Sequence, residues 1–315
     1  MIIHADWSIN PRKRWMVVAN KQPNHRWLIE QPRVVDDPTS LFKNLTPKIL
    51  QSGCLLAGFD FPIGLPYKFA LKAGLTDFLS TLPLFGNREW SQFYTPAEIP
   101  SQISLYRSFY PARPGGTKRQ HLEHGLDLQF KHLFRLCEIA HENRRAACPL
   151  FWTLGGQQVG NAAINRWKSL ISPALNDPQL HVSIWPFAGS LEDLCKPGEI
   201  IVVETYPAEY YGHLGLFSSV ERKSKRRQID RKYYSERLIA WSDERQLELD
   251  KALIASFKDG FGYSPDGEDR FDALVGLYGM INVVLGNHPT GESFPPHNDK
   301  IEGWIFGQEQ PKEDT

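Results

Sequence analysis

The sequence has no surplus of either charge and no long apolar run. Lys and Arg total 36, and Asp and Glu also total 36, so no net field draws the whole molecule onto nucleic acid or an anionic membrane. A polyanion must therefore bind at a local patch. No apolar stretch approaches the roughly 18 residues of a membrane span, and no signal-type apolar run precedes the first predicted strand. We expect a cytoplasmic protein that does not bind membranes.

Cysteine is also scarce. The four cysteines are Cys54, Cys137, Cys148 and Cys195, and none forms the close pair that a zinc site or a redox motif requires. We therefore expect four buried free thiols. A hydrophobic content of 41% with 23% charged residues is typical of a globular chain that buries a large core.

The first sixty residues alternate short β-like runs with turns. The runs IIHAD, RWMVVAN and HRWLIEQ predict three antiparallel strands, because turn residues separate them. A helical pattern of apolar residues covers 41–50 and ends near Gly53. The apolar run CLLAGFD then predicts a fourth strand that is buried on both faces.

The remainder predicts an insertion, a fifth strand and closing helices. Residues 62–197 are punctuated by Pro and Gly, with helices expected at about 118–145 and 161–170, and we interpret them as an insertion within one domain spanning 1–315. The run EIIVVE predicts the fifth strand, and helices are expected at 221–237, at about 243–257 and from 266 onward. This element order is that of the ribonuclease H-like α/β fold, a mixed five-stranded sheet flanked by helices.

Three carboxylates stand where apolar strands end: Asp6, Asp60 and Glu204. In open α/β sheets the carboxyl ends of parallel strands diverge into loops and leave a crevice where ligands bind. If the first, fourth and fifth strands are adjacent and parallel, the three acids converge. Asp269 and Asp272 are spaced to share one face of the closing helix.

Two glycines, Gly276 and Gly279, continue that face of the closing helix. Small residues at these positions would let the helix approach the sheet closely. The two aspartates would then join the acids at the strand ends.

Converging carboxylates repel one another, so such a cluster needs a multivalent cation. We expect Mg²⁺ or Mn²⁺, which prefer hard oxygen ligands, with Asp6, Asp60 and Asp272 as metal ligands. Two ions in such a site would activate a water and stabilise the leaving oxygen of a phosphoryl displacement. All five acids are candidate catalytic residues.

Each acid also has a structural explanation. Asp6 with Ser8 could start a turn, and Asp60 could cap the bend at Phe61-Pro62. Asp266, Glu268 and Asp269 could complement the dipole of the closing helix. Glu204 is harder to explain in this way, since a carboxylate directly after four branched aliphatic residues needs a partner.

Three segments, GFDFPIGLP, VVETYPAE and DRFDALVGLYG, resemble the signatures of the uncharacterised "predicted RNase H-like nuclease" family. That family belongs to the ribonuclease H-like superfamily, which also contains the Holliday-junction resolvases. The resemblance implies that Asp6 is the first-strand acid, that Asp60 is the fourth-strand acid and that Glu204 is an additional fifth-strand acid. It also implies that Asp269 and Asp272 are the paired acids of the closing helix.

The stretch ERKSKRRQIDRKYYSER concentrates positive charge and contains two tyrosines. It could contact a phosphate backbone and stack on bases, or it could be a solvated helix face. The candidate nucleic-acid-binding residues are Lys223, Lys225, Arg226 and Arg227.

Three functions remain open at this point. The first is a metal-dependent nuclease or phosphodiesterase acting on DNA, RNA or another phosphodiester. The second is an actin-like ATP-dependent phosphotransferase, which should have a Gly close behind the first-strand Asp, whereas this chain has Trp7 there and Phe61-Pro62 after Asp60. The third is a catalytically silent nucleic-acid-binding protein of the same fold.

Overall fold

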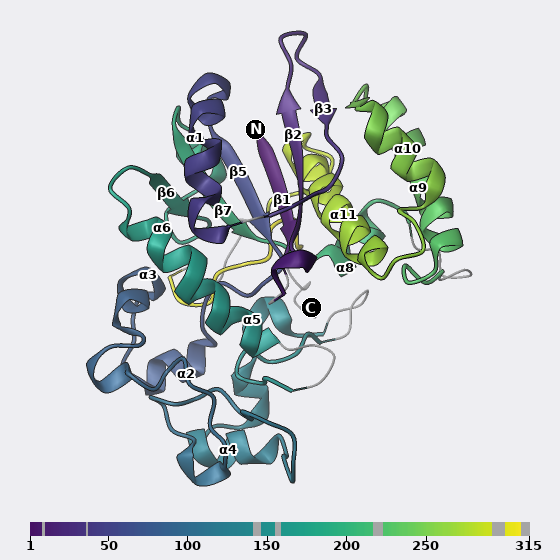
Figure 1. Ribbon diagram of the computed structural model, residues 1–315. Helices are drawn as coiled ribbons and strands as arrows, with labels where there is room; N and C mark the ends of the chain where they lie inside the picture. Colours follow the sequence, from purple (N-terminus) through teal and green to yellow (C-terminus); the bar gives the residue numbers. More distant parts are fainter. Residues whose placement is uncertain are drawn as a thin grey trace, which may run out of the picture.

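A computed structural model describes residues 1–7, 10–35, 37–140, 146–154, 159–216, 223–291 and 300–309. It is a mixed α/β structure with an eight-stranded sheet between helices (Figure 1). The α/β class expected from the sequence is therefore confirmed. The expected sheet of five strands is extended by three short ones.

The strand order is β6-β7-β5-β1-β2-β3-β8, and β4 pairs with β2. Strands β1 and β2 are antiparallel, as are β2 and β3, whereas β1, β5, β7 and β6 are parallel to one another. The three strands that end in acids are thus adjacent and parallel, which is the condition that their convergence required. The strands are β1 Ile2–Asp6, β2 Trp15–Lys21, β3 Trp27–Ile29, β4 Arg33–Val34, β5 Leu55–Phe59, β6 His181–Ile184, β7 Glu199–Glu204 and β8 Glu248–Leu249.

Side-chain alternation along the strands divides the interior into two cores, one on each face of the sheet. On one face Ile3 and Ala5 of β1 pack with α1 and with the segment 62–182. On the other face Ile2 packs with α8 to α11. The helices are α1 Leu41–Ser52, α2 Tyr67–Lys72, α3 Phe78–Thr81, α4 Gln120–Leu126, α5 Val159–Arg166, α6 Ser172–Asn176, α7 Leu191–Leu194, α8 Pro207–His213, α9 Gln228–Glu244, α10 Lys251–Asp259 and α11 Asp266–Val284.

The expected long helix at 118–145 is wrong. Only α4 forms there, because Asp127 takes a left-handed backbone conformation with φ 49° that ends the helix. Two short 3₁₀ turns follow, at Phe130–Leu133 and Leu136–Glu138. Residues 141–145 lie outside the described part.

The closing helices are also displaced from their expected ranges. Residues 223–227 form a turn before α9, and residues 221–222 lie outside the described part. The expected helix at 243–257 is split, because α9 ends at Glu244 and the side chain of Asp250 caps α10 by accepting a hydrogen bond from Leu253 N.

The expectation of four free thiols is wrong for two of them. Cys54 and Cys195 form a disulfide with a Cα–Cα distance of 5.7 Å, whereas Cys137 and Cys148 are buried thiols. Cys54 directly precedes β5, and Cys195 lies just before β7. Because these parallel strands are neighbours, their starting ends meet although 141 residues separate the two cysteines in sequence.

Among the residues that the structure describes, no helix is both long and apolar enough to cross a membrane.

Helix α11 lies directly against β1 at Gly276 and against α8 at Gly279. A Cβ atom at Gly276 would stand 2.1 Å from His4 Cε1, and one at Gly279 would stand 2.1 Å from Tyr210 Cδ2. The imidazole of His4 is buried, with Nδ1 2.9 Å from Ala273 O and Nε2 2.9 Å from Thr205 Oγ1. The predicted close approach to the sheet is confirmed at Gly276, whereas Gly279 makes room for Tyr210 of α8.

Replacing Gly276 by Ala should lower the free energy of unfolding by about 1–3 kcal/mol, because the added methyl group overlaps the ring of His4. Gly212→Ala in α8 is the matched control, since nothing lies within 4 Å of a Cβ there. That variant should be unchanged or more stable by up to about 1 kcal/mol. Denaturant unfolding of both variants would check this, and equal stabilities would contradict it.

Candidate active site

Four aspartates converge where β1 and β5 end beneath the start of α11. Asp6 closes β1 on the same face as Ile2 and His4, which is the face that α11 covers. Asp60 follows β5, and its Oδ1 lies 3.3 Å from the backbone N of Trp7. Each of these side chains is only partly buried, so solvent reaches the cluster.

Electrostatic interaction joins the four groups. Burial raises the pKa of Asp6 well above its ordinary value, and repulsion from Asp60, Asp272 and Asp269 raises it further. Burial also raises the pKa of Asp60 to about 7, while the hydrogen bond from Trp7 N opposes this shift. Without a cation, the cluster therefore retains protons near neutral pH.

The two aspartates of α11 have cationic neighbours. Burial raises the pKa of Asp272, and the ammonium of Lys225 opposes this by bonding to Oδ2. The hydroxyl of Tyr211 donates to Asp272 Oδ1 at 2.9 Å. Burial likewise raises the pKa of Asp269, opposed by Lys13, whose Nζ is 4.0 Å from Oδ2.

Arg166 is a site residue that the sequence did not reveal. This buried residue of α5 donates from Nη2 to Trp7 O at 3.0 Å, and its guanidinium lies 5.6 Å from the centre of the Trp7 ring. Burial and Arg14 lower its pKa to about 10, while Asp60 and Asp6 raise it. It brings a positive charge from the segment 62–197 to the acidic cluster, and no motif in the sequence marks it.

Glu204 does not join the four aspartates. Its register partner in β5 is Phe59, so its side chain points to the sheet face opposite α11. There Arg135 binds both carboxylate oxygens, at 2.6 and 2.7 Å, and Ile63 N donates at 2.7 Å. The partner that we expected for Glu204 from the sequence is therefore Arg135, in the 62–197 segment.

The four basic residues that precede α9 make different contacts. Lys225 reaches the acidic cluster, whereas Lys223 Nζ lies 4.5 Å from the centre of the Tyr233 ring. Arg227 pairs with Asp230 at 2.6 Å. Arg226 has its side chain 82% exposed and Nε 3.8 Å from Glu268 Oε2. These residues form one charged edge beside the aspartates rather than a helix face.

The donor chemistry of the cluster fits a hard divalent cation. Four carboxylates supply oxygen ligands of the kind that Mg²⁺ and Mn²⁺ prefer, and Asp269 Oδ2 is buried without a hydrogen-bond partner in the described part. As the side chains stand, no group of three or more His, Cys, Asp or Glu in the described ranges is arranged to hold a metal ion. In this arrangement Lys225 neutralises Asp272 instead.

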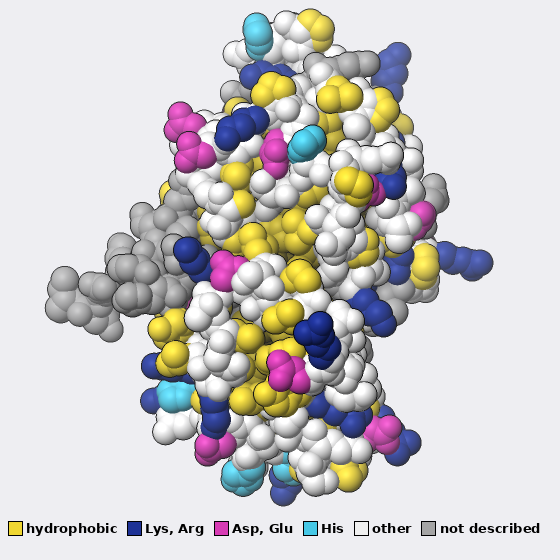
Figure 2. Space-filling view, turned by 90° about the vertical axis from the view of Figure 1, so that its left-hand side faces the viewer, with side chains coloured by type: hydrophobic (Ala, Val, Ile, Leu, Met, Phe, Trp, Pro, Cys, Tyr) yellow, Lys and Arg dark blue, Asp and Glu magenta, His cyan; other side chains and the backbone are white. Residues whose placement is uncertain are grey.

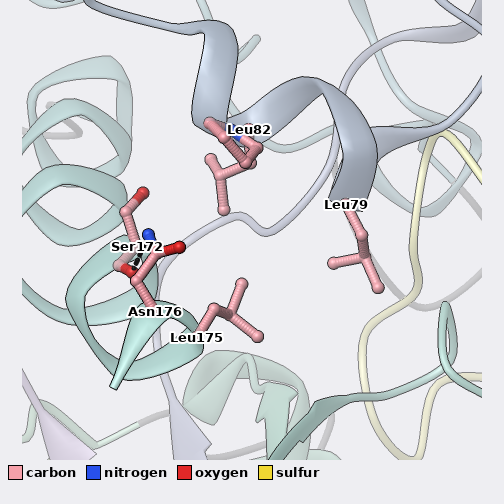
Figure 3. Close-up of a pocket in the computed structure, with 6 residues that line it drawn as sticks. Leu79, Leu82, Ser172, Leu175 and Asn176 are labelled. Carbon is pink, nitrogen blue, oxygen red and sulfur yellow. Dashed lines mark hydrogen bonds between the residues drawn. The ribbon is translucent and has the colours of Figure 1, made fainter. Parts of the chain in front are cut away.

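An apolar cavity lies elsewhere. It measures about 230 Å³ and lies between α3 and α6 (Figure 3). Figure 2 shows hydrophobic side chains gathered in the middle of the face of the molecule that carries these helices and α1. None of the four aspartates contributes to the cavity, whose lining residues are Leu79, Leu82, Pro83, Ser172, Leu175 and Asn176.

Comparisons of the chain with protein-family models, with curated proteins and with solved structures found no match.

Metal-free stability should fall as pH rises from about 4 to about 7, because the pKa of Asp60 is raised from 3.8 to about 7 by folding. In this range the unfolded chain releases the Asp60 proton while the folded protein keeps it. Asp60→Asn should remove this contribution, so its stability relative to the parent should increase by about 1 kcal/mol per pH unit. Urea unfolding in EDTA across this range would measure it, and a difference that does not change with pH would refute it.

Glu204→Gln should lower the free energy of unfolding by roughly 3 kcal/mol, since it leaves the buried guanidinium of Arg135 without its bidentate carboxylate. The loss is at the lower end for a broken buried pair because Glu138 still bonds Arg135 at 3.0 Å. Any stabilisation by Mn²⁺ should match that of the parent. Loss of the Mn²⁺ response in a folded variant would place Glu204 in the metal site after all.

Proposed function

We propose that this protein is a divalent-metal-dependent phosphodiesterase with a ribonuclease H-like fold, and that its substrate is nucleic acid. The observation that carries the proposal is the convergence of Asp6, Asp60, Asp269 and Asp272 at one edge of the sheet. Like charges gathered in this way destabilise the fold unless a cation binds them. Carboxylates whose pKa values are strongly raised by burial and mutual repulsion are concentrated at functional sites.

The topology supports the same proposal. The central strands run β3-β2-β1-β5-β7, with β2 antiparallel to its neighbours, and this agrees with the element order from which the fold was predicted. The acids lie at the carboxyl ends of parallel strands, where α/β sheets bind ligands.

Different residues of the chain would bind the metal ion, orient its ligands and supply positive charge. A Mg²⁺ or Mn²⁺ ion held by Asp6, Asp60 and an aspartate of α11 would supply a nucleophilic water and positive charge at the leaving oxygen. Trp7 N orients Asp60, and the Tyr211 hydroxyl orients Asp272. The guanidinium of Arg166 adds positive charge behind Asp6 and Asp60.

The charged edge before α9 supports a polyanionic substrate, either DNA or RNA. Arg226 is exposed and lies near Glu268 of α11, and Lys223 lies over the ring of Tyr233. Because the whole molecule has no net charge, the attraction of phosphates would be local. Binding through these side chains should weaken as salt concentration rises, since each phosphate contact releases condensed counterion.

The parent protein should hydrolyse bis-p-nitrophenyl phosphate in the presence of Mn²⁺ and should melt at a higher temperature with Mn²⁺ than in EDTA. Asp6→Asn and Asp60→Asn should each lose at least about 100-fold in activity and lose the Mn²⁺ response of the melting temperature. Both should remain folded, because Asn keeps the shape and removes a repelled charge.

Glu236→Gln is the matched control, since this carboxylate of α9 is exposed and is not among the groups that shift the pKa of the four aspartates. It should retain both activity and the Mn²⁺ response. Folded Asp→Asn variants that keep full hydrolysis and respond to Mn²⁺ like the parent would end the proposal.

A further inference from the structure

We infer that Lys225 acts as a built-in cation of the proposed site, so that the protein works with one divalent ion and one ammonium group instead of two ions. The inference rests on the proposed phosphodiesterase function. It names the residue that would occupy the place of the second ion.

Lys225 reaches into the acidic cluster from outside α11. Its ammonium bonds to Asp272 Oδ2 and lies 3.6 Å from Glu268 Oε1. It also interacts electrostatically with Asp6 across the cluster. The side chain of Asp272 is 13% exposed, so this ion pair is partly withdrawn from water. In that environment it should be stronger than an exposed pair.

The backbone around Lys225 is held by three side chains of α9. Arg231 Nη1 donates to Lys225 O at 2.7 Å, and Tyr234 donates from its hydroxyl to Lys223 O at 2.8 Å. Asp230 accepts a hydrogen bond from Ser224 N at 2.8 Å. The turn that carries Lys225 is therefore fixed, and the side chain starts from a defined position beside α11.

Arg231 also ties this turn to the beginning of α11. It is buried and donates to Gly260 O at 2.9 Å and to Gly262 O at 2.6 Å. A Cβ atom at Gly267 would stand 2.5 Å from Arg231 Nη2. The guanidinium therefore fits against the first turn of α11 because this position is a glycine. One buried arginine thus contacts the turn that carries Lys225, the loop before α11 and the first turn of α11.

The ammonium group of Lys225 has the chemistry needed to replace a second metal ion. In a two-ion phosphodiesterase, the second ion shares a carboxylate with the first and stabilises charge on the leaving oxygen. Lysine offers a compact positive charge with three donors, and it is a common ligand for phosphate. The side chain of Lys225 is 39% exposed, so a phosphate oxygen can reach it while Asp272 holds it. With both oxygens of Asp272 bonded, Asp6, Asp60 and Asp269 remain for one ion.

The test is the number of Mn²⁺ ions bound by the full chain, measured by isothermal titration calorimetry without substrate. The parent should bind one ion. Lys225→Gln should bind two, because Asp272 is released and can hold the second ion. Lys225→Arg keeps the charge and should still bind one ion. Lys258→Gln, at an exposed lysine of α10, should behave as the parent.

The possible outcomes separate the two ideas. Equal ion numbers in the parent and Lys225→Gln, whether one or two, overturn the role of Lys225 and leave the phosphodiesterase proposal standing if Mn²⁺-dependent hydrolysis is observed. If Lys225→Gln does not fold, two ions in the parent or in Lys225→Arg overturn the role equally. A parent that neither binds Mn²⁺ nor hydrolyses the phosphodiester removes the proposed function and this inference together.

Discussion

The contact between α11 and β1 is the constraint on which the rest of the site depends. Burial lowers the pKa of His4 to about 3, so the imidazole stays neutral and can bridge Ala273 O and Thr205 Oγ1. Gly276 leaves the space that the ring needs. Asp272 precedes Gly276 by one helical turn, and Asp6 follows His4 by two strand positions, so the same contact brings the two acids together.

The positions of strand ends and the spacing along one helix were sufficient to predict that the four aspartates lie close together. Asp6 and Asp60 follow apolar runs that are parallel neighbours, and the spacing of Asp269 and Asp272 places them on one helix face. Glu204 met the same criterion, yet the alternation of side chains turns it to the other side of the sheet. A single position along a strand decides which core a side chain enters, and an apolar run buried on both faces gives no sign of that choice.

Other features depend on tertiary contacts that no local pattern carries. Arg166 and Arg135 both lie in the 62–197 segment, and each finds its partner far away in the chain. The pairing of Cys54 with Cys195 requires knowing that β5 and β7 are neighbours. The sequence marks Lys225 as basic, but its position beside α11 depends on the hydrogen bond from Arg231 to its backbone oxygen. A charge pattern alone would place Arg231 on a solvated helix face.

The ion pair between Arg135 and Glu204 has a consequence for how this chain could be shortened or recombined. The arginine also donates to Ile63 O and Glu302 O, so one guanidinium connects a sheet strand, the 62–197 segment and the last described stretch of the chain. A truncated protein lacking 62–197 would lose this guanidinium and would also uncover the face of the sheet on which Ile3, Ala5 and Phe59 pack. Its remaining strands would then expose a contiguous apolar surface to water. The segment is therefore half of the core, and it cannot be removed like a surface loop.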